Sequence, residues 1–401
     1  MKPTVKIASL LLAVLMFVSV FASGCTINKE WSYKTSDKEL PIGVYIYSLY
    51  SAYNQALSYA EKLDDYDPTK DNWLDMEITD DDGNKEVARK WIKNKAEETC
   101  LEFLAVDAEL KKLNATPDES MVETLDKNAE SNWNFGTTYT QYIGYFTPMK
   151  TTLEPYGISY DSYCMVASEF SADQETLFDK LYFEGGSKEV SKDEIEKYFV
   201  DNYVRYAYLP VPLYESKTDE DTQQTTNTAY SDDKIKKIST ALDGVAKEVN
   251  AISDTSKAAE KSESLIADFI TENSLTEDSL VKNTAKKDET NVGDEVDKVI
   301  ADLGEGKAKT IKVGSGDTAT YYYVFRYNTQ AAKDDYLTSG DNDHTIIGKM
   351  KQKDFESYMK ELAKALKHEK SSAVDGYDPK MFFVSKEPET TEATEDTKAE
   401  K

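Results

Sequence analysis

Apolar residues recur at helical spacing in the first half of the chain and again near its end. One stripe, which predicts an amphipathic helix, consists of Ile46, Tyr50, Tyr53, Leu57 and Ala60. A second stripe runs from Ile92 to Ala108, and a third lies between Ile346 and Lys370. We expect the third helix to pack on the first two, because a one-sided apolar stripe needs a partner face.

The pattern changes type at residues 190–212, which read VSKDEIEKYFVDNYVRYAYLPVP. Ser191 and Glu194 have the spacing of a capping box, so a helix should begin near Lys192. From Val204 onward the residues are mainly tyrosine and β-branched, and two prolines, at 210 and 212, forbid a helix. These prolines suit an edge strand or the end of a strand. A helical unit should therefore end here and a sheet begin.

The chain after this point predicts a module of strands and helices. The predicted elements are a strand from Val204, helices over 231–251 and 257–273, a short helix over 294–303, and strands over 310–313 and 320–327. The polar segment 215–230 has the composition of a flexible surface insertion. The predicted fold class is α+β, with a helical N-terminal unit completed by a C-terminal helix and a β-α-β module inserted between them.

The N-terminal residues have the pattern of an export signal. Lys2 and Lys6 precede a mostly apolar stretch of 15 residues, Ile7–Phe21, and small residues follow it. This stretch is shorter than the roughly 20 residues of a spanning helix, so the exported protein is predicted not to be transmembrane. The predicted organisation is a signal over 1–24, a tether over 25–40, a helical domain over 41–189, a second domain over 190–330, a C-terminal helical segment over 331–385 and a disordered tail over 386–401.

The end of the signal resembles the lipobox of bacterial lipoproteins. Residues 22–25 read Ala-Ser-Gly-Cys, and in that family the cysteine becomes the lipidated first residue. The resemblance implies that Cys25 is a lipid anchor and that the protein lies on the extracytoplasmic side of a bacterial cell membrane. The alternative is an ordinary secretory cleavage site that happens to precede a free cysteine.

Composition excludes several function classes. The net charge of −27 disfavours nucleic acid and electrostatic adhesion to an anionic bilayer as partners. The chain has two histidines, too few for histidine-based catalysis or a clustered metal site, and it lacks a phosphate-cradling Gly-Lys-Ser/Thr motif. The acidic loop that contains Asp80, Asp82 and Gly83 fails the spacing of a calcium loop. We therefore predict neither a metal ion nor a cofactor.

Two features leave alternatives open. Cys100 and Cys164 are an even pair in an exported protein and could form a disulfide or remain free, with a small buried side chain expected at Cys100. The segment 133–163 is rich in tyrosine and phenylalanine. It could line a groove for a polypeptide, although aromatic packing between helices is the commoner reason for such a composition.

The order of parts resembles the PrsA and SurA-like foldases of the bacterial envelope, and the second domain resembles their parvulin domain. The matching segments are VSKDEIEKYFVDNY before the module, VRYAYLPV over 204–211 as its first strand, ADLGEG over 301–306, and YYYVFRY over 321–327 as its last strand. In parvulins the first and last strands each carry a histidine that flanks the bound proline. Here the corresponding positions hold Tyr208 and Tyr323, and the family's glycine-rich segment has no counterpart.

The resemblance implies a degenerate parvulin-like domain without catalytic residues. Its candidate peptide-binding residues are Tyr206, Tyr208, Tyr321, Tyr323 and Phe325. The alternative is that these aromatic residues simply pack against the helices of the module. Efficient prolyl isomerisation is not expected, because lowering a barrier of roughly 18–20 kcal/mol needs placed polar groups in a shaped pocket.

The function that follows is a membrane-anchored foldase or holdase that binds unfolded, newly exported polypeptides. Two alternatives stay open: an active peptidyl-prolyl isomerase that uses tyrosines in place of histidines, and a solute-binding or adhesive surface lipoprotein. A homodimer is also left open.

Overall fold

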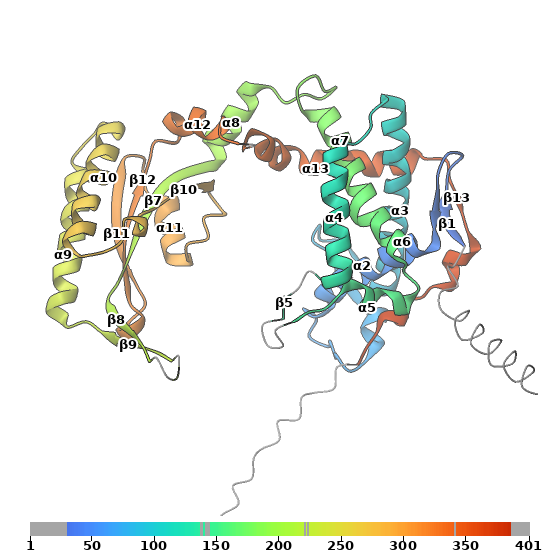
Figure 1. Ribbon diagram of the computed structural model, residues 1–401, viewed down its shortest axis with the longest axis horizontal. Coiled ribbons are helices and arrows are strands. Elements are labelled where there is room, and N and C mark those ends of the chain that lie inside the picture. Colours follow the sequence, from blue (N-terminus) through green and yellow to red (C-terminus); the bar gives the residue numbers. More distant parts are fainter. Residues whose placement is uncertain are drawn as a thin grey trace, which may run out of the picture. The chain divides into compact units, whose positions relative to one another are not determined.

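A computed structural model describes residues 30–385 apart from 137–138, 141–144, 220–221, 223 and 341. The predicted signal, Cys25 and the predicted tail over 386–401 lie outside the described residues. The chain divides into two compact units, one within Met1–Ser187 and Lys353–Lys401 and the other formed by Lys188–Gln352. Both units combine helices with small antiparallel sheets, so the expected α+β class is confirmed (Figure 1).

The first unit is mainly helical. Its helices are α2 (Ile42–Ala60), α3 (Ala88–Leu113), α4 (Glu119–Phe135), α5 (Met149–Leu153), α6 (Tyr160–Cys164) and α7 (Ser171–Tyr182), with a π-helical turn η3 (Met165–Phe170) and short 3-10 turns η1 (Asp71–Asp75), η2 (Glu154–Tyr156), η6 (Ser372–Gly376) and η7 (Pro379–Phe382). Its strands are β1 (Trp31–Lys34), β2 (Glu39–Pro41), β3 (Glu77–Thr79), β4 (Lys85–Val87), β5 (Tyr139–Thr140), β6 (Tyr145–Phe146) and β13 (Glu369–Lys370).

Helix α2 forms the centre of this unit. It is apolar around most of its circumference, as expected for a helix surrounded by other elements, and more than half of its residues are buried. It packs on α3, where the buried Cys100 thiol lies 3.9 Å from the Ser48 hydroxyl. Cys100 and Cys164 are both free, which answers the disulfide question and confirms the buried position of Cys100.

The C-terminal part of the chain completes the same core. Helix α13 (Asn342–Ala365) carries Phe355, whose ring meets the Phe178 ring of α7 edge to face at 5.3 Å. Further on, the buried Phe382 packs between the rings of Tyr53 and Tyr156. None of the helices in the described parts of the chain is long and apolar enough to cross a membrane.

The predicted polar tether is wrong in its second half. Residues 31–41 form β1 and β2, which pair with each other and with β13 in a three-stranded sheet. Ser32, Tyr33 and Leu40 in this hairpin are completely buried. The segment looked polar because its apolar residues are few, but the consecutive residues Ser32 and Tyr33 are both buried, so both faces of β1 are covered. Residues 31–40 therefore belong to the folded part, which was expected to start near Pro41.

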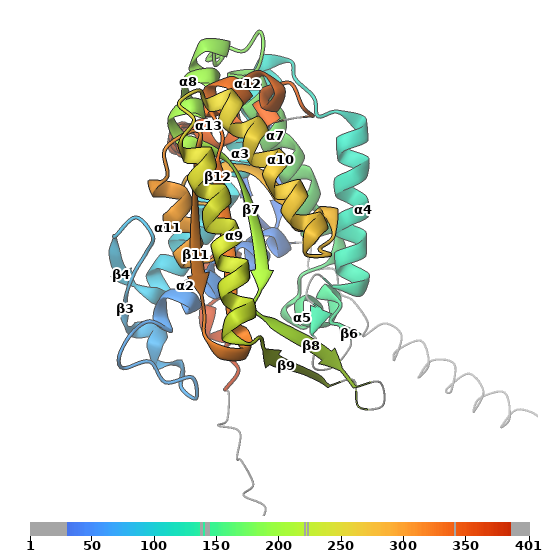
Figure 2. The same ribbon diagram turned by 90° about the vertical axis from the view of Figure 1, so that its left-hand side faces the viewer.

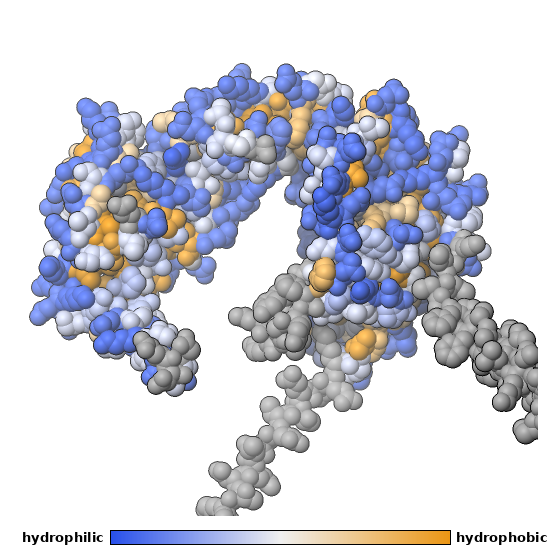
Figure 3. Space-filling model, in the orientation of Figure 1, coloured by the Kyte–Doolittle hydropathy of each residue, from blue (hydrophilic) through white to orange (hydrophobic). Residues whose placement is uncertain are grey.

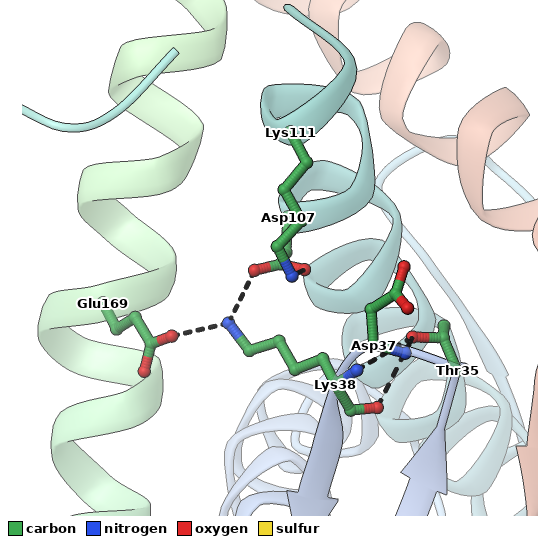
Figure 4. Close-up of polar contacts among 6 residues, drawn as sticks. All are labelled: Thr35, Asp37, Lys38, Asp107, Lys111 and Glu169. Atoms are coloured by element: carbon green, nitrogen blue, oxygen red, sulfur yellow. Dashed lines mark hydrogen bonds and ion pairs between the residues drawn. The ribbon is translucent and has the colours of Figure 1, made fainter. Parts of the chain in front are cut away.

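A buried charge cluster fixes this N-terminal hairpin to the helices (Figure 4). The Lys38 ammonium lies 3.2 Å from Asp107 of α3 and 2.5 Å from Glu169 of η3, and it stands 4.3 Å from the centre of the Phe103 ring. Lys111 completes the cluster at 2.7 Å from Asp107. Asp173 of α7 is buried beside these groups, and burial raises the pKa of its carboxyl to about 6. Lys38 therefore pairs with carboxylates from two helical segments, α3 and η3.

The second unit is built on one four-stranded antiparallel sheet in the order β10-β7-β12-β11. The strands are β7 (Tyr203–Pro212), β10 (Val281–Lys286), β11 (Lys307–Val313) and β12 (Thr320–Arg326), and a separate hairpin is formed by β8 (Tyr214–Thr218) and β9 (Thr225–Ala229). The helices are α8 (Lys192–Asn202), α9 (Asp232–Asn250), α10 (Thr255–Glu272), α11 (Asp294–Asp302) and α12 (Thr329–Leu337), with 3-10 turns η4 (Glu277–Ser279) and η5 (Gly316–Thr318).

Helices cover both faces of this sheet. In Figure 2, α9 and α10 lie in front of β7, β11 and β12, and their apolar side chains form one core with Leu209, Tyr323 and Phe325. On the other face the short helix α11 packs on Val204, Tyr206 and Val324 in a second, smaller core. Strand alternation divides the residues between the faces, because successive side chains point in opposite directions.

The helix before the sheet begins as predicted. The Ser191 hydroxyl accepts from the Glu194 backbone N–H and the Glu194 carboxylate accepts from the Ser191 backbone N–H, which forms a complete capping box. The prolines at 210 and 212 lie at the end of β7, beyond the last residue paired with β10. Here β7 has a neighbour only on its β12 side and then ends, so the prolines lie at an edge and at the end of the strand, as expected.

Several elements differ from the prediction. Strand β10 was missed, since its sequence VKNTAK is mostly polar and covers one edge of the sheet. The expected flexible insertion over 215–230 contains the β8–β9 hairpin. The second unit continues past 330 to Gln352, because α12 packs on α8, with the rings of Phe199 and Tyr336 stacked at 5.0 Å.

Replacement of Lys38 by methionine tests the N-terminal cluster. Methionine keeps the packing on Phe103 but leaves Asp107 and Glu169 without their shared cation. We expect the free energy of unfolding to fall by about 2–3 kcal/mol, somewhat below the roughly 3–5 kcal/mol seen when one partner of a fully buried pair is removed, because Glu169 is half exposed. Urea denaturation at pH 7 measures the change.

The matched control is Lys127→Met, which breaks an exposed pair with Glu123 on α4. We expect it to change the free energy of unfolding by less than about 0.5 kcal/mol. Equal effects of the two substitutions would show that Lys38 does not hold the hairpin.

Candidate functional site

The predicted site residue Tyr208 lies in the middle of the four-stranded sheet. Its strand β7 pairs with β12 on one side and β10 on the other, which places Tyr208 opposite Val324 and Val281. The first and last strands of the predicted module are therefore neighbours. The resemblance to parvulins requires these two strands to be neighbours in one sheet.

Beyond the part covered by α11, the same face of the sheet carries a half-buried apolar strip. We call this strip the tyrosine face; its members are Tyr208, Pro210, Ile311, Val313 and Tyr322. The rings of Tyr208 and Tyr322 have their centroids 6.5 Å apart, the diagonal arrangement of residues on neighbouring strands. Half-buried aromatic side chains offer large contact areas at a low cost in conformational entropy, which suits them to bind other chains.

Tyr206 forms the inner border of the tyrosine face. Its ring lies 6.3 Å from that of Tyr208, but the side chain is completely buried. The Tyr206 hydroxyl donates to the Thr290 carbonyl oxygen at 3.1 Å and accepts from the Asn283 side chain at 3.2 Å. Both bonds are used inside the unit, so Tyr206 supports the tyrosine face rather than presenting a free polar group.

The other three candidates lie on the opposite face of the sheet, beneath α9 and α10. Tyr323 is completely buried, with its hydroxyl 2.7 Å from the Ser262 hydroxyl, and Phe325 is buried beside it. Tyr321 is half-buried, and its hydroxyl donates to Asp243 of α9 at 2.7 Å. The structure thus separates these three residues from Tyr206 and Tyr208. The five candidates do not form one surface, because they belong to alternate positions of two paired strands.

Tyr322 is the residue that the sequence analysis missed. The resemblance to the family matched Tyr208 and Tyr323 to its two histidine positions, yet the two side chains point to opposite faces of the sheet. In a strand of three consecutive tyrosines, a one-residue difference in register exchanges the face of every side chain. The alternation itself was visible in the sequence, but the pairing that fixes it depends on the β7–β12 contact.

Besides the hydroxyls of Tyr208 and Tyr322, the neighbouring buried tyrosines add no polar group to the tyrosine face. The Tyr206 hydroxyl is engaged within the unit, and the Tyr323 hydroxyl lies on the far side of the sheet. In the described part of the chain, no group of His, Cys, Asp and Glu side chains could hold a metal ion. The chemistry that this face supports is therefore apolar and aromatic contact.

The first unit carries a groove of about 890 Å³ that the sequence analysis did not anticipate. We call it the α3–α13 groove. Its lining residues come from the end of α2 (Gln55, Tyr59), the β3–β4 hairpin (Asp80, Asp81, Asp82, Asn84, Lys85, Glu86), α3 (Trp91, Asn94, Lys95, Glu97, Glu98, Leu101) and α13 (Glu356, Lys360, Ala363, Lys364). Seven carboxylates and four lysines among them give the groove an excess of negative charge.

Aromatic residues form the wall of the groove near the hairpin. The Tyr59 and Trp91 rings meet edge to face at 5.6 Å, and the Tyr59 hydroxyl donates to Asp81 at 2.6 Å. Across the visible side of the molecule in Figure 3, hydrophilic residues predominate and hydrophobic residues form separate patches. The groove thus combines an aromatic wall with carboxylates.

Glu102 lies on α3 one turn beyond Glu98, and it is not among the residues that line the groove. On α3 it follows Lys95 and Glu98 at the spacing of one helix face, and Lys360 and Glu356 of α13 complete its charged surroundings. Its side chain is 9% exposed, and it takes part in none of the hydrogen bonds or ion pairs found among the described residues. Burial raises the pKa of the Glu102 carboxyl to about 7.

The aromatic segment over 133–163 shows packing where it is described. Trp133 and Tyr163 are buried and their rings lie 5.4 Å apart, with Tyr47 of α2 against Tyr163 on the other side. These contacts join α4 and α6 to α2, so these residues serve the core. The remainder of the segment contains residues outside the described part of the chain.

Comparison with known proteins gives a limited result. No model of a protein family matches the chain, and no curated protein matches it significantly. Among solved structures, the chain is similar to the foldase protein PrsA from Streptococcus pneumoniae, with 14% sequence identity and a TM-score of 0.33 over 77% of this chain and 100% of that chain. This level of similarity does not by itself assign a family or an activity.

Glu102→Gln tests whether ionisation of the buried carboxyl lowers the free energy of unfolding. Because folding raises the pKa of the Glu102 carboxyl, the folded protein is more stable when this group is protonated. This contribution to the free energy of unfolding is fully present below the pKa of the unfolded state and is lost as the pH rises through about 7. Glutamine keeps the size without the charge. We expect the variant to be more stable than the unmodified protein by about 2–3 kcal/mol at pH 8 and by less than about 1 kcal/mol at pH 5.

Urea denaturation at the two pH values measures this difference. Asp173 titrates over an overlapping range, so the relevant quantity is the difference between variant and unmodified protein at each pH. Glu123→Gln, an exposed glutamate on α4, is the control and should show no such pH dependence. A variant less stable than the unmodified protein at pH 8 would contradict our description of Glu102.

Proposed function

We propose that the protein is an extracytoplasmic foldase of the holdase type, which binds unfolded exported polypeptides and releases them without chemical change. The observation that carries this proposal is the tyrosine face, a half-buried aromatic and apolar strip on a sheet whose first and last strands are neighbours. One of its residues, Tyr208, holds a position at which the resembled foldases carry a histidine that flanks the bound proline. Tyr208 and Tyr322 are the residues that we expect to contact a client.

The geometry favours binding over catalysis. Rotation about an X–Pro bond is accelerated only by groups that stabilise the twisted imide better than the planar one. At the tyrosine face the nearest buried hydroxyl, that of Tyr206, is held by Thr290 and Asn283. The hydroxyls of Tyr208 and Tyr322 are not held in place by a hydrogen bond to another described residue, so we expect this face to bind the planar and twisted forms about equally and to leave the barrier unchanged.

The proposal includes anchoring at a membrane face. Lipidation of Cys25 would hold the folded units close to the membrane, where exported chains emerge unfolded, and several acyl chains at about 0.8 kcal/mol per buried methylene would make the attachment stable. The high negative charge favours solubility at that location. Mass spectrometry of the protein isolated from its native membrane tests this part through the mass of the N-terminal peptide.

The holdase activity is tested by the aggregation of a reduced, unfolded secreted protein, followed by light scattering. At stoichiometric ratio we expect the protein to suppress aggregation, because the tyrosine face covers apolar segments that would otherwise associate. The double substitution Tyr208→Ser and Tyr322→Ser should reduce this suppression at least threefold. Tyr198→Ser on α8 is the matched control, since it removes a half-buried tyrosine away from that face.

All variants should first be shown to unfold at a temperature close to that of the unmodified protein. Absence of suppression by the unmodified protein would overturn the proposed function. Equal loss in the Tyr198 variant would show that the tyrosine face is not the surface responsible.

Isomerase activity is tested with a short proline peptide whose cis and trans forms are followed by exchange NMR. We expect the exchange rate to equal the uncatalysed rate, which has a time constant of tens to hundreds of seconds at 25 °C. An acceleration that disappears in Tyr208→Phe would instead support the isomerase alternative.

A further inference from the structure

Strands β7 and β8 of the second unit have a side without a neighbouring strand. The pairing of β7 with β10 ends where Tyr208 lies opposite Val281. The chain before β10 turns away from β7, since the Ser279 N–H donates to the Thr276 carbonyl oxygen at 3.0 Å. After Leu213 the chain continues as β8, and within the described part of the chain β8 has β9 as its one strand neighbour.

The hydrogen bonds at the two ends of β8 show which of its residues face this open side. The Leu213 carbonyl oxygen accepts from the Tyr230 N–H, and the Asp219 N–H donates to the Gln224 carbonyl oxygen. Main-chain groups of consecutive residues alternate between the two sides of an antiparallel strand, so the odd-numbered residues of β8 face β9. The residues that turn both N–H and C=O to the open side are therefore Tyr214, Ser216 and Thr218.

Two prolines limit the part of the open side that can pair with another strand. The Arg205 carbonyl oxygen accepts from the Tyr327 N–H, so the odd-numbered residues of β7 face β12 and the even-numbered ones face the open side. Pro210 and Pro212 lie there without an N–H to donate. A strand placed against them would form half of the usual bonds, so complete pairing is confined to β8.

We propose that β8 pairs with β8 of a second copy of this chain, antiparallel and centred on Ser216. The hairpins of the two copies would then form one four-stranded sheet. In this arrangement Ser216 lies opposite the same residue of the second copy, and Tyr214 lies opposite Thr218 of the second copy. Each of these pairs consists of outward-facing residues, so both of its main-chain hydrogen bonds can form.

The charges on β8 fit a second copy in this register. Glu215 and Lys217 lie on the same face of the strand with their charged atoms 3.7 Å apart, and both side chains are exposed. A two-fold axis at Ser216 places each glutamate opposite the lysine of the other copy. Moving the axis by one residue would place the two glutamates, or the two lysines, opposite each other, and like charges at opposite positions destabilise a sheet.

The hairpin is accessible, and its pairing surface is small. Residues 215–218 are all exposed, and Figure 2 shows the hairpin projecting beyond the end of β7. One short strand buries less than the roughly 1,200–2,000 Å² of stable protein interfaces, so we expect a weak, reversible dimer. Attachment of both copies to one membrane, as proposed above, would raise their effective concentration and favour pairing.

Sedimentation equilibrium of the full protein at low ionic strength tests this interface. We expect a monomer–dimer equilibrium, and Ser216→Pro should raise its dissociation constant at least tenfold because each copy loses the central N–H. The matched control is Ala229→Pro, which removes an N–H from the far side of β9 and should change the constant less than twofold. Both variants should unfold at a temperature close to that of the unmodified protein.

Charge exchange tests the register. Glu215→Lys and Lys217→Glu should each raise the dissociation constant at least fivefold, because like charges then lie opposite each other in the dimer. An equimolar mixture of these two variants should form a heterodimer at least as tight as the unmodified dimer, since opposite charges meet again at every position.

A protein that stays monomeric at its highest soluble concentration would overturn the proposal. A dimer that Ser216→Pro and both charge variants leave unchanged would also overturn it, because the copies would then associate through another surface. A mixture that fails to form the heterodimer would overturn the register. A monomeric protein whose suppression of aggregation falls in Ser216→Pro would assign the open side of β8 to an extended client instead of a second copy.

Discussion

The pairing of β7 with β12 is the interaction on which the second unit depends. These two strands, separated by more than a hundred residues, form the centre of the sheet and carry the residues of both hydrophobic cores. Their antiparallel register decides which tyrosines lie under α9 and α10 and which lie beside α11. A shift by one residue would bury Tyr322 and expose Tyr323, and it would replace the tyrosine face with another surface.

Local patterns were sufficient to predict most elements. The apolar stripes gave α2, α3 and α13, the capping box at Ser191 gave the start of α8, and the tyrosine-rich segments gave β7 and β12. Elements without a local apolar signal were missed, such as the polar edge strand β10 and the hairpin of β1 and β2. The faces of the site residues depended on long-range pairing, so Tyr323 was placed with Tyr208 although the two lie on opposite sides of the sheet.

The first unit contains carboxyl groups that are paired with cations and one buried carboxyl group that is not. Around Lys38 the carboxylates have cations within 3.2 Å, and the cluster holds the N-terminal hairpin to the helices. At Glu102, burial raises the pKa of the carboxyl group, and no ion pair or hydrogen bond to it is found among the described residues. The first arrangement serves the fold. The second lowers stability where the carboxyl is ionised.

The central claim, that unfolded chains bind at the tyrosine face, is tested most directly by photo-cross-linking. A benzophenone amino acid placed at position 322 should attach covalently to an unfolded secreted protein, whereas the same group at position 198 should not. Folded client should give no product at either position. Cross-linking at 198 as strong as at 322, or its absence at 322, would contradict the account.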